Sequence, residues 1–298
     1  MKPEITPLST NCAEKKTLSD NQMKKRLLVA VIGLMGLSLG MLEAKEEVHY
    51  NTKISADVQY SIIRGLEIHA GEEIRLNEKF GFARTYTNAG LSYKPVSWLK
   101  LGLDYYAIGV QKTDEIIDGL TGETSYKDYT DWKHRAAFSV IGSYKYGGWH
   151  FSLRERIQGS YRMKDVNKYQ STRFLVASRT RAKVSYKFFN VPIEPYVAFE
   201  LRAELNAPKW QLNDDFVPDT KGNATFLGYK DAYLDRYRTE LGVDWQLRRN
   251  HFLNFAFTYD RILNKEIDSN KEGTKLKAPI VESWENRLYF GIGYTFKF

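Results

Sequence analysis

The last fifteen residues of the chain alternate between apolar and polar side chains, and the chain ends on an aromatic residue. Because successive side chains of a β-strand point to opposite faces, this alternation predicts a strand with one apolar face and one polar, glycine-rich face. The apolar face carries Trp284, Leu288, Phe290, Ile292, Tyr294, Phe296 and Phe298, and the polar face carries Glu285, Arg287, Tyr289, Gly291, Gly293, Thr295 and Lys297. A soluble strand can show the same alternation, so the rest of the chain decides the class of protein.

The same alternation recurs along nearly the whole chain from Tyr50 onward. The segments are Tyr50–Ile62, Leu66–Leu76, Arg84–Lys94, Trp98–Val110, Trp132–Tyr146, Trp149–Met163, Arg173–Phe188, Tyr196–Leu205, Tyr233–Leu247 and His251–Ile262. Tight turns between them alternate with the longer polar stretches Gln111–Asp131, Asp165–Thr172, Asn206–Asp231 and Asn264–Ser283. Such a rhythm, with strands long enough for a tilted membrane crossing, disfavours a soluble β-sandwich. The sequence therefore predicts an all-β protein, a transmembrane antiparallel up-and-down β-barrel.

The number of strands follows less directly from the pattern. About eleven segments alternate, whereas single-chain bacterial barrels have even numbers of strands. Twelve strands are predicted if a short strand around Glu46–Tyr50 precedes the first segment. Ten is the alternative, in which the first segment is not a full strand of the wall.

The N-terminal region has the three parts of a secretory signal peptide. The basic residues Lys24, Lys25 and Arg26 precede the apolar run Leu27–Leu42, and a small-residue exit ends at Ala44. Because a start at Met23 suits such a peptide, we assign residues 1–22 to an upstream-start extension, 23–44 to a cleavable signal peptide and 45–298 to the barrel. A retained membrane anchor is the alternative. The predicted location is the outer membrane of a Gram-negative bacterium, with the membrane lipid as one partner.

Composition excludes other classes of protein. A mean hydropathy of −0.48 with 27% charged residues does not fit a bundle of membrane-spanning helices. The net charge of +8 would suit a nucleic-acid partner in a soluble protein, but export makes that partner implausible. The single cysteine, Cys12, precedes the apolar run, so no disulfide is expected. The five histidines are scattered, and no phosphate or dinucleotide motif occurs, so no metal site or cofactor is predicted.

The polar faces of the predicted strands carry many charged side chains. The predicted lumen-lining residues are Glu73, Arg75, Arg154, Arg156, Arg179, Arg181, Lys183, Glu200, Arg202, Glu204, Arg236, Arg238, Glu240, Glu285 and Arg287. Arginines and carboxylates on these faces can pair across the interior and cross-link the wall. Because the basic residues exceed the acidic ones, the same faces also predict a narrow passive channel with a mild anion preference, its solute unknown. Both interpretations can hold together.

Two other functions are alternatives. A structural or receptor barrel would use its long outer loops, of which Gln111–Asp131 is rich in acidic residues. An enzyme acting on envelope lipid would need a nucleophile and a base, and only His150 and Ser152 lie two apart on one strand. The Asn-Gly continuation of outer-membrane phospholipases is absent after Ser152, and the pair is expected to face inward near a turn. We therefore predict no catalytic site.

Five short motifs resemble one uncharacterised family of Gram-negative outer-membrane barrels, a domain of unknown function. The motifs are Glu73-x-Arg75, Gly90-Leu91-Ser92-Tyr93, Arg154-Glu155-Arg156, Glu200-Leu201-Arg202 and Tyr294-Thr295-Phe296-Lys297-Phe298, and the resemblance covers about Tyr50 to Phe298. The last motif is similar to the C-terminal signal that the barrel-assembly machinery reads. The resemblance thus implies Tyr294, Phe296 and Phe298 as an assembly signal and that machinery as a partner.

Overall fold

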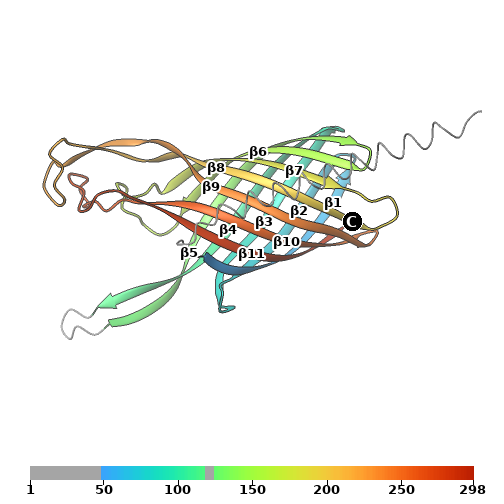
Figure 1. The fold of residues 1–298 in the computed structure, drawn as a ribbon, viewed down its shortest axis with the longest axis horizontal. Coiled ribbons are helices and arrows are strands. Elements are labelled where there is room, and N and C mark those ends of the chain that lie inside the picture. The colour runs from blue at the N-terminus through green and yellow to red at the C-terminus, as the bar shows by residue number, and fades with distance from the viewer. Residues whose placement is uncertain (1–47, 118–123) are drawn as a thin grey trace, which may run out of the picture. The chain divides into compact units, whose positions relative to one another are not determined.

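The computed structural model describes residues 48–117 and 124–298. The predicted upstream extension and signal peptide lie outside the described residues. The described chain forms eleven β-strands in one closed barrel (Figure 1). The strands are β1 (Val48–Ile63), β2 (Leu66–Leu76), β3 (Phe82–Val96), β4 (Leu99–Ile117), β5 (Thr124–Tyr146), β6 (Trp149–Arg162), β7 (Phe174–Tyr186), β8 (Ile193–Leu212), β9 (Ala224–Arg248), β10 (His251–Glu266) and β11 (Val281–Lys297). No helix long and apolar enough to cross a membrane occurs in these residues.

The barrel closes through a parallel pair of strands. Consecutive strands pair antiparallel from β1 to β11, and β1 then pairs parallel with β11, from Val48 opposite Asn286 to Gln59 opposite Lys297. The prediction of twelve strands, or of ten, is wrong. The first segment is a full strand of the wall, bonded to β11 on one side and β2 on the other. The even-number rule assumes that all pairs are antiparallel, and a parallel closing pair removes that condition.

The two ends of the barrel differ in their connections. At one end, which we call the turn end, lie the tight connections 64–65, 97–98, 147–148 and 249–250, the connection 187–192 and the C terminus. Gly65 (φ 85°) and Gly147 (φ 56°) supply the left-handed backbone that two of these turns need. The opposite end, the loop end, carries the connections 163–173, 213–223 and 267–280 and the start of β1. Figure 1 shows this separation, with the long connections at the end away from the C terminus.

Two stretches that the sequence indicated as loops are largely strand. β4 continues to Ile117 and β5 begins at Thr124, so most of the expected loop Gln111–Asp131 is a hairpin with continuous pairing. The expected loop Asn206–Asp231 is likewise occupied by the ends of β8 and β9, which reach Leu212 and Ala224. These parts of the strands lie outside the segments whose hydrophobicity alternates, so the alternation could not predict them.

The exterior of the barrel is apolar and the interior is polar. Exposed side chains around the wall include Leu91, Leu103, Phe138, Ile157, Phe199, Phe257 and Phe290. The side chains that alternate with these are polar or small and mostly buried, and Asp260 is completely buried. This is the reverse of a soluble protein, whose exposed apolar patches rarely exceed a few hundred Å².

A small hydrophobic cluster, which we call the loop core, joins the connections at the loop end. It is built on buried Trp210, Ala224 and Leu276, against which Tyr169, Phe216, Phe226, Ile267 and Ile280 pack. Trp210 Nε1 donates to the carbonyl oxygen of Tyr169 over 2.9 Å. Asn223 donates to the carbonyl oxygen of Leu276 and accepts from its N–H. The three long connections therefore form one ordered unit.

Candidate functional site: the charged interior

Four arginines lie side by side on neighbouring strands of the interior face. Arg156 on β6 is opposite Arg179 on β7, Arg179 is opposite Arg202 on β8, and Arg202 is opposite Arg236 on β9. We call this set the arginine row. Because like charges directly opposite one another are destabilising in a sheet, the row requires carboxylates nearby.

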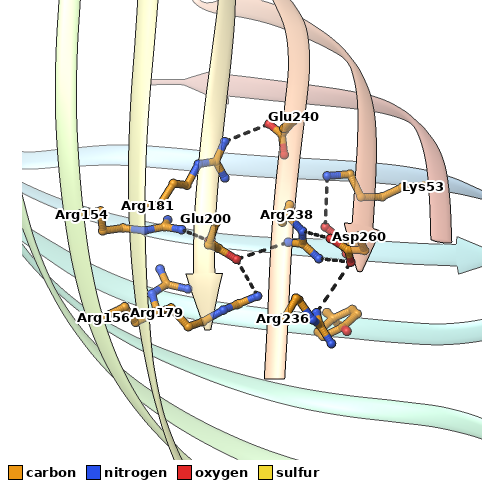
Figure 2. Close-up of polar contacts among 12 residues, drawn as sticks. Lys53, Arg154, Arg156, Arg179, Arg181, Glu200, Arg236, Arg238, Glu240 and Asp260 are labelled. Atoms are coloured by element: carbon orange, nitrogen blue, oxygen red, sulfur yellow. Dashed lines mark hydrogen bonds and ion pairs between the residues drawn. The ribbon is translucent and has the colours of Figure 1, made fainter. Parts of the chain in front are cut away.

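Such carboxylates lie in the adjacent row of interior positions. Counted along β6, this row is one step closer to the turn end than the arginine row. This mixed row consists of Arg154, Arg181, Glu200, Arg238, Asp260 and Arg287, again cross-strand partners from β6 to β11. In Figure 2, arginines from three strands converge on Glu200. Its carboxylate lies 3.0 Å from Arg154 Nη2, 2.9 Å from Arg179 Nη2 and 3.7 Å from Arg238 Nη1. One buried carboxylate is thus shared by three guanidinium groups from both rows.

Asp260 is shared in the same way, whereas Arg202 is itself shared by two carboxylates. Asp260 binds Arg238 at two points and lies 3.8 Å from Arg236 Nη1. Arg202 pairs with Glu204 at 2.8 Å and with Asp235 at 2.9 Å. These contacts connect the members of the two rows into a network that crosses several strands.

Asp104 on β4 anchors the far end of the arginine row. Its Oδ2 lies 3.0 Å from Arg156 Nη2, and its Oδ1 lies 2.9 Å from His69 Nε2. Gly90 makes this arrangement feasible, because a Cβ at that position would stand 2.5 Å from both Asp104 Oδ1 and His69 Nε2. Through Asp104 on β4, the contacts therefore tie β6 to β2 across three intervening strands.

A second layer of contacts lies on the turn-end side of the rows. Arg181 Nη2 is 2.9 Å from Glu240 Oε1, and the hydroxyl of Tyr196 donates to the same oxygen over 2.7 Å. Lys183 pairs with Asp244 at 3.0 Å and lies over the ring of Tyr196, 3.7 Å from its centroid. The aromatic ring thus carries a cation on its face and a carboxylate at its hydroxyl.

The arginine donors are not fully used by the protein. The Nε atoms of all four members of the arginine row, Arg156, Arg179, Arg202 and Arg236, and that of Arg154 are buried without a hydrogen-bond partner among the described residues. A guanidinium has five N–H donors, and a buried donor that stays unpaired costs about 1–3 kcal/mol. The row therefore has unused donor capacity for water or an anion.

The structure places the remaining predicted lumen residues in local pairs at the loop end. Arg75 pairs with Glu73 at 2.7 Å and lies between the rings of Tyr86 and Tyr289, at 4.7 and 5.1 Å from their centroids. Glu285 and Arg287, two residues apart on β11, pair at 2.6 Å.

Three carboxylates central to the network were missed from the sequence: Asp104, Asp235 and Asp260. The signal was present for Asp260, because it shares its strand face with Ala256 and Thr258.

The pair His150 and Ser152, which the lipid-enzyme alternative would use, lies on the interior face of β6. His150 and Ser152 alternate with exposed Phe151 and Leu153, so both lie on the interior face near the turn at Gly147. No hydrogen bond joins the two side chains in the described part of the chain, so their geometry gives the lipid-enzyme hypothesis no support. Groups of three or more metal-ligating side chains are likewise not found within residues 48–117 and 124–298.

The C-terminal aromatics pack against their neighbours in the wall. Phe298 lies 4.4 Å from Phe296 and 6.0 Å from Tyr60 between ring centroids, and its N–H donates to the carbonyl oxygen of Gln59. The hydroxyl of Tyr294 lies 2.7 Å from His251 Nδ1. Their recognition by the assembly machinery stays a prediction.

The comparisons with known proteins show no family. No protein-family model and no curated protein matches the sequence, so the resemblance to a family of unknown function stays a prediction. Among solved structures, the chain is similar to outer-membrane expressed OmpT of Vibrio cholerae, at 13% identity and a TM-score of 0.35, over 77% of this chain and 63% of that one. In-vitro folded OmpT matches at 16% identity and a TM-score of 0.34, over 79% of this chain and 61% of that one.

A more distant match is the siderophore receptor PirA from Acinetobacter baumannii. It has 9% identity and a TM-score of 0.27, over 78% of this chain and 47% of that one. The chain thus spans less than two thirds of the length of each matched structure. Similarities this low carry no argument about function, which rests on the geometry above.

Proposed function

We propose that the barrel spans the outer membrane of a Gram-negative bacterium. Its exterior carries a continuous set of exposed apolar side chains, which only a lipid environment would cover around a closed wall. Aromatic side chains border this band, as expected at membrane interfaces. Tyr93, Trp98, Tyr146 and Trp245 lie toward the turn end, and Tyr50, Trp132 and Tyr161 lie toward the loop end. By the long-loop convention, the loop end faces the cell exterior.

The activity that we propose is that of a narrow passive channel with a mild preference for anions. The observation that carries it is the set of five buried Nε–H donors, all of the arginine row and Arg154, that find no acceptor among the described residues. Glu200 and Asp260 are each shared by more than one arginine, so the positive charge around these two carboxylates is incompletely balanced. In a low-dielectric tube such an imbalance is magnified and lowers the barrier to anions.

The experiment is single-channel recording with purified barrel in planar lipid bilayers. We expect small, steady conductance steps and, in a salt gradient, a reversal potential displaced toward that of chloride. A protein that is inserted and heat-modifiable but gives no conductance would show that the charged network closes the interior.

The loop core favours a second candidate, a receptor barrel. Loops that share buried Trp210 and Leu276 present a fixed outer surface, whereas loops that only connect strands need no core. Shortening the β10–β11 connection between Asp268 and Lys277 would remove this surface and leave the wall intact. Conductance unchanged by this deletion, with loss of a ligand captured by wild-type barrel, would favour the receptor.

A further inference from the structure

A group of four basic side chains lies at the loop end of the interior, apart from the arginine row. Its members, which we call the mouth patch, are Arg84 on β3, Lys112 on β4, Lys133 on β5 and Arg162 on β6. Lys133 and Arg162 are direct cross-strand partners, so their Cβ atoms are roughly 5 Å apart. Arg84 is aligned with Val110 on β4, and Val110 with Asp131 on β5, which places Arg84 beside the same group. The patch therefore follows four consecutive strands.

The mouth patch is poorly neutralised compared with the rows below it. Among the described residues, Asp131 alone has a carboxylate within 4 Å of a member of the patch. It lies 3.6 Å from Lys112 Nζ and 3.8 Å from Lys133 Nζ. Arg84 instead donates to the hydroxyl of Tyr86, and Arg162 to the hydroxyl of Ser171 over 3.4 Å. The charges of Arg162, Arg84 and Lys112 all act repulsively on the Lys133 ammonium. Four cations with one carboxylate among them are incompletely compensated, and such like charge lowers the stability of the folded barrel.

Cavities open on both sides of the mouth patch. One, of about 460 Å³, is lined by Arg84 together with Arg75, Arg287, the amides of Asn51 and Gln111, and the carboxylates Glu78 and Glu285. The other, of about 560 Å³, is lined by Lys112 and Arg162 together with Lys265, Tyr233, Thr172 and the carboxylates Glu204 and Glu266. Both volumes fall in the range of small-molecule sites, roughly 300–1,000 Å³. Three of the four members of the mouth patch, Arg84, Lys112 and Arg162, thus border space that a small solute can enter.

We propose that the mouth patch binds oxyanion groups of the phosphate type on a small soluble molecule at the outer mouth of the barrel. Guanidinium and ammonium groups on four neighbouring strands can bind several oxygens of a multivalent anion, whereas chloride can use only a fraction of these donors. This inference rests on the proposed channel, because a site at the outer mouth would collect anions before they enter it. Its binding is a separate property of these four residues.

The position of the patch selects a soluble ligand over a lipid headgroup. Lys133 and Arg162 alternate along their strands with Trp132 and Tyr161, which are exposed on the exterior. The basic side chains therefore point away from the surface that the lipid would cover. A headgroup phosphate would have to leave the leaflet and pass over the rim to reach them.

The test is isothermal titration of the full-length, refolded barrel with sodium tripolyphosphate in a non-ionic detergent, with sodium chloride of equal ionic strength as reference. We expect binding above the chloride reference. Arg84→Gln and Arg162→Gln should each raise the dissociation constant about tenfold, as the loss of one charge-assisted hydrogen bond would. Asp131→Asn should lower it, because the competing carboxylate is removed. Lys145→Gln, the same charge change at the turn end of β5, should leave it unchanged.

The outcomes separate this site from the channel. Wild-type binding no greater than with chloride, or patch variants that bind like wild type, would overturn the proposal even if the barrel conducts. Tripolyphosphate binding that Arg84→Gln and Arg162→Gln weaken and Asp131→Asn strengthens supports the proposal, even in a barrel that gives no current. The lipid source is tested in nanodiscs: loss of tripolyphosphate binding when phosphatidic acid replaces phosphatidylcholine would overturn the assignment to a soluble ligand.

Discussion

Arg238 donates two hydrogen bonds to Asp260, from Nε to Oδ1 over 2.5 Å and from Nη2 to Oδ2 over 2.7 Å. The two residues are direct cross-strand partners on β9 and β10, and the Asp260 side chain is fully buried. This two-point contact fixes the plane of the guanidinium. Because Arg238 also lies 3.7 Å from Glu200, its orientation links the two carboxylates of the mixed row.

Replacement of Asp260 by asparagine should strongly destabilise the barrel. The change keeps the volume but leaves Arg238 and Arg236 without this buried countercharge. Breaking a buried ion pair by removing one partner costs about 3–5 kcal/mol. The midpoint of urea unfolding in detergent, followed by loss of heat-modifiable migration, would measure the effect.

Asp219→Asn is the matched control for this substitution. Asp219 is an exposed loop carboxylate whose pKa is lowered by its hydrogen bond with Lys275, and its backbone has a φ of 62°, which asparagine tolerates. We expect an unchanged midpoint. An equal loss in both variants would contradict a special role for the buried pair.

Alanine at Gly242 should also destabilise the wall. Its Cβ would stand 2.4 Å from Cζ of Tyr196, whose hydroxyl is held by Glu240 and Asn254. We expect a net loss of about 1–3 kcal/mol from overpacking. Gly142→Ala is the control, since nothing lies within 4 Å of its added Cβ. If both variants unfold like wild type, Tyr196 is free to move and this layer is not rigid.

The loop core can be tested separately from the wall. Leu276→Ala removes a fully buried side chain, and such truncations cost about 2–5 kcal/mol. We expect the connections 163–173, 213–223 and 267–280 to become sensitive to protease while heat-modifiable migration is retained. Val217→Ala, at an exposed position, should leave protection intact. Protection that survives Leu276→Ala would argue against one cooperative loop unit.

The terminal aromatic is expected to matter for assembly. Phe298→Asp leaves the backbone bond to Gln59 available, but it removes the ring contacts with Phe296 and Tyr60. We expect less heat-modifiable barrel in the outer membrane of expressing cells, with refolding in detergent little changed. Normal insertion in cells would end the assignment of Phe298 to an assembly signal.

The sequence predicted which residues share a face, because the period of a strand is fixed by its backbone. It therefore placed Arg156, Arg179, Arg202 and Arg236 on the polar faces of their strands. It did not predict that Arg202 and Arg236 are aligned with Arg156 and Arg179, since alignment depends on the register between strands, which turns and bulges set. One such shift falls between Arg202 and Ala203, beside the arginine row. The strand number was missed for a related reason, because the parallel closure of β1 on β11 leaves no mark in the alternation.

The reversal potential of single channels in a potassium chloride gradient tests the central claim most directly. Wild-type barrel should favour chloride, and the double substitution Arg179→Glu with Arg181→Glu should shift the reversal potential toward that of potassium, because it reverses charge at two interior positions. Lys145→Glu, an exposed position at the turn end, should shift it far less. Heat-modifiable migration would first confirm that each variant is folded. A wild-type preference for potassium that the double substitution leaves unaltered would contradict the account.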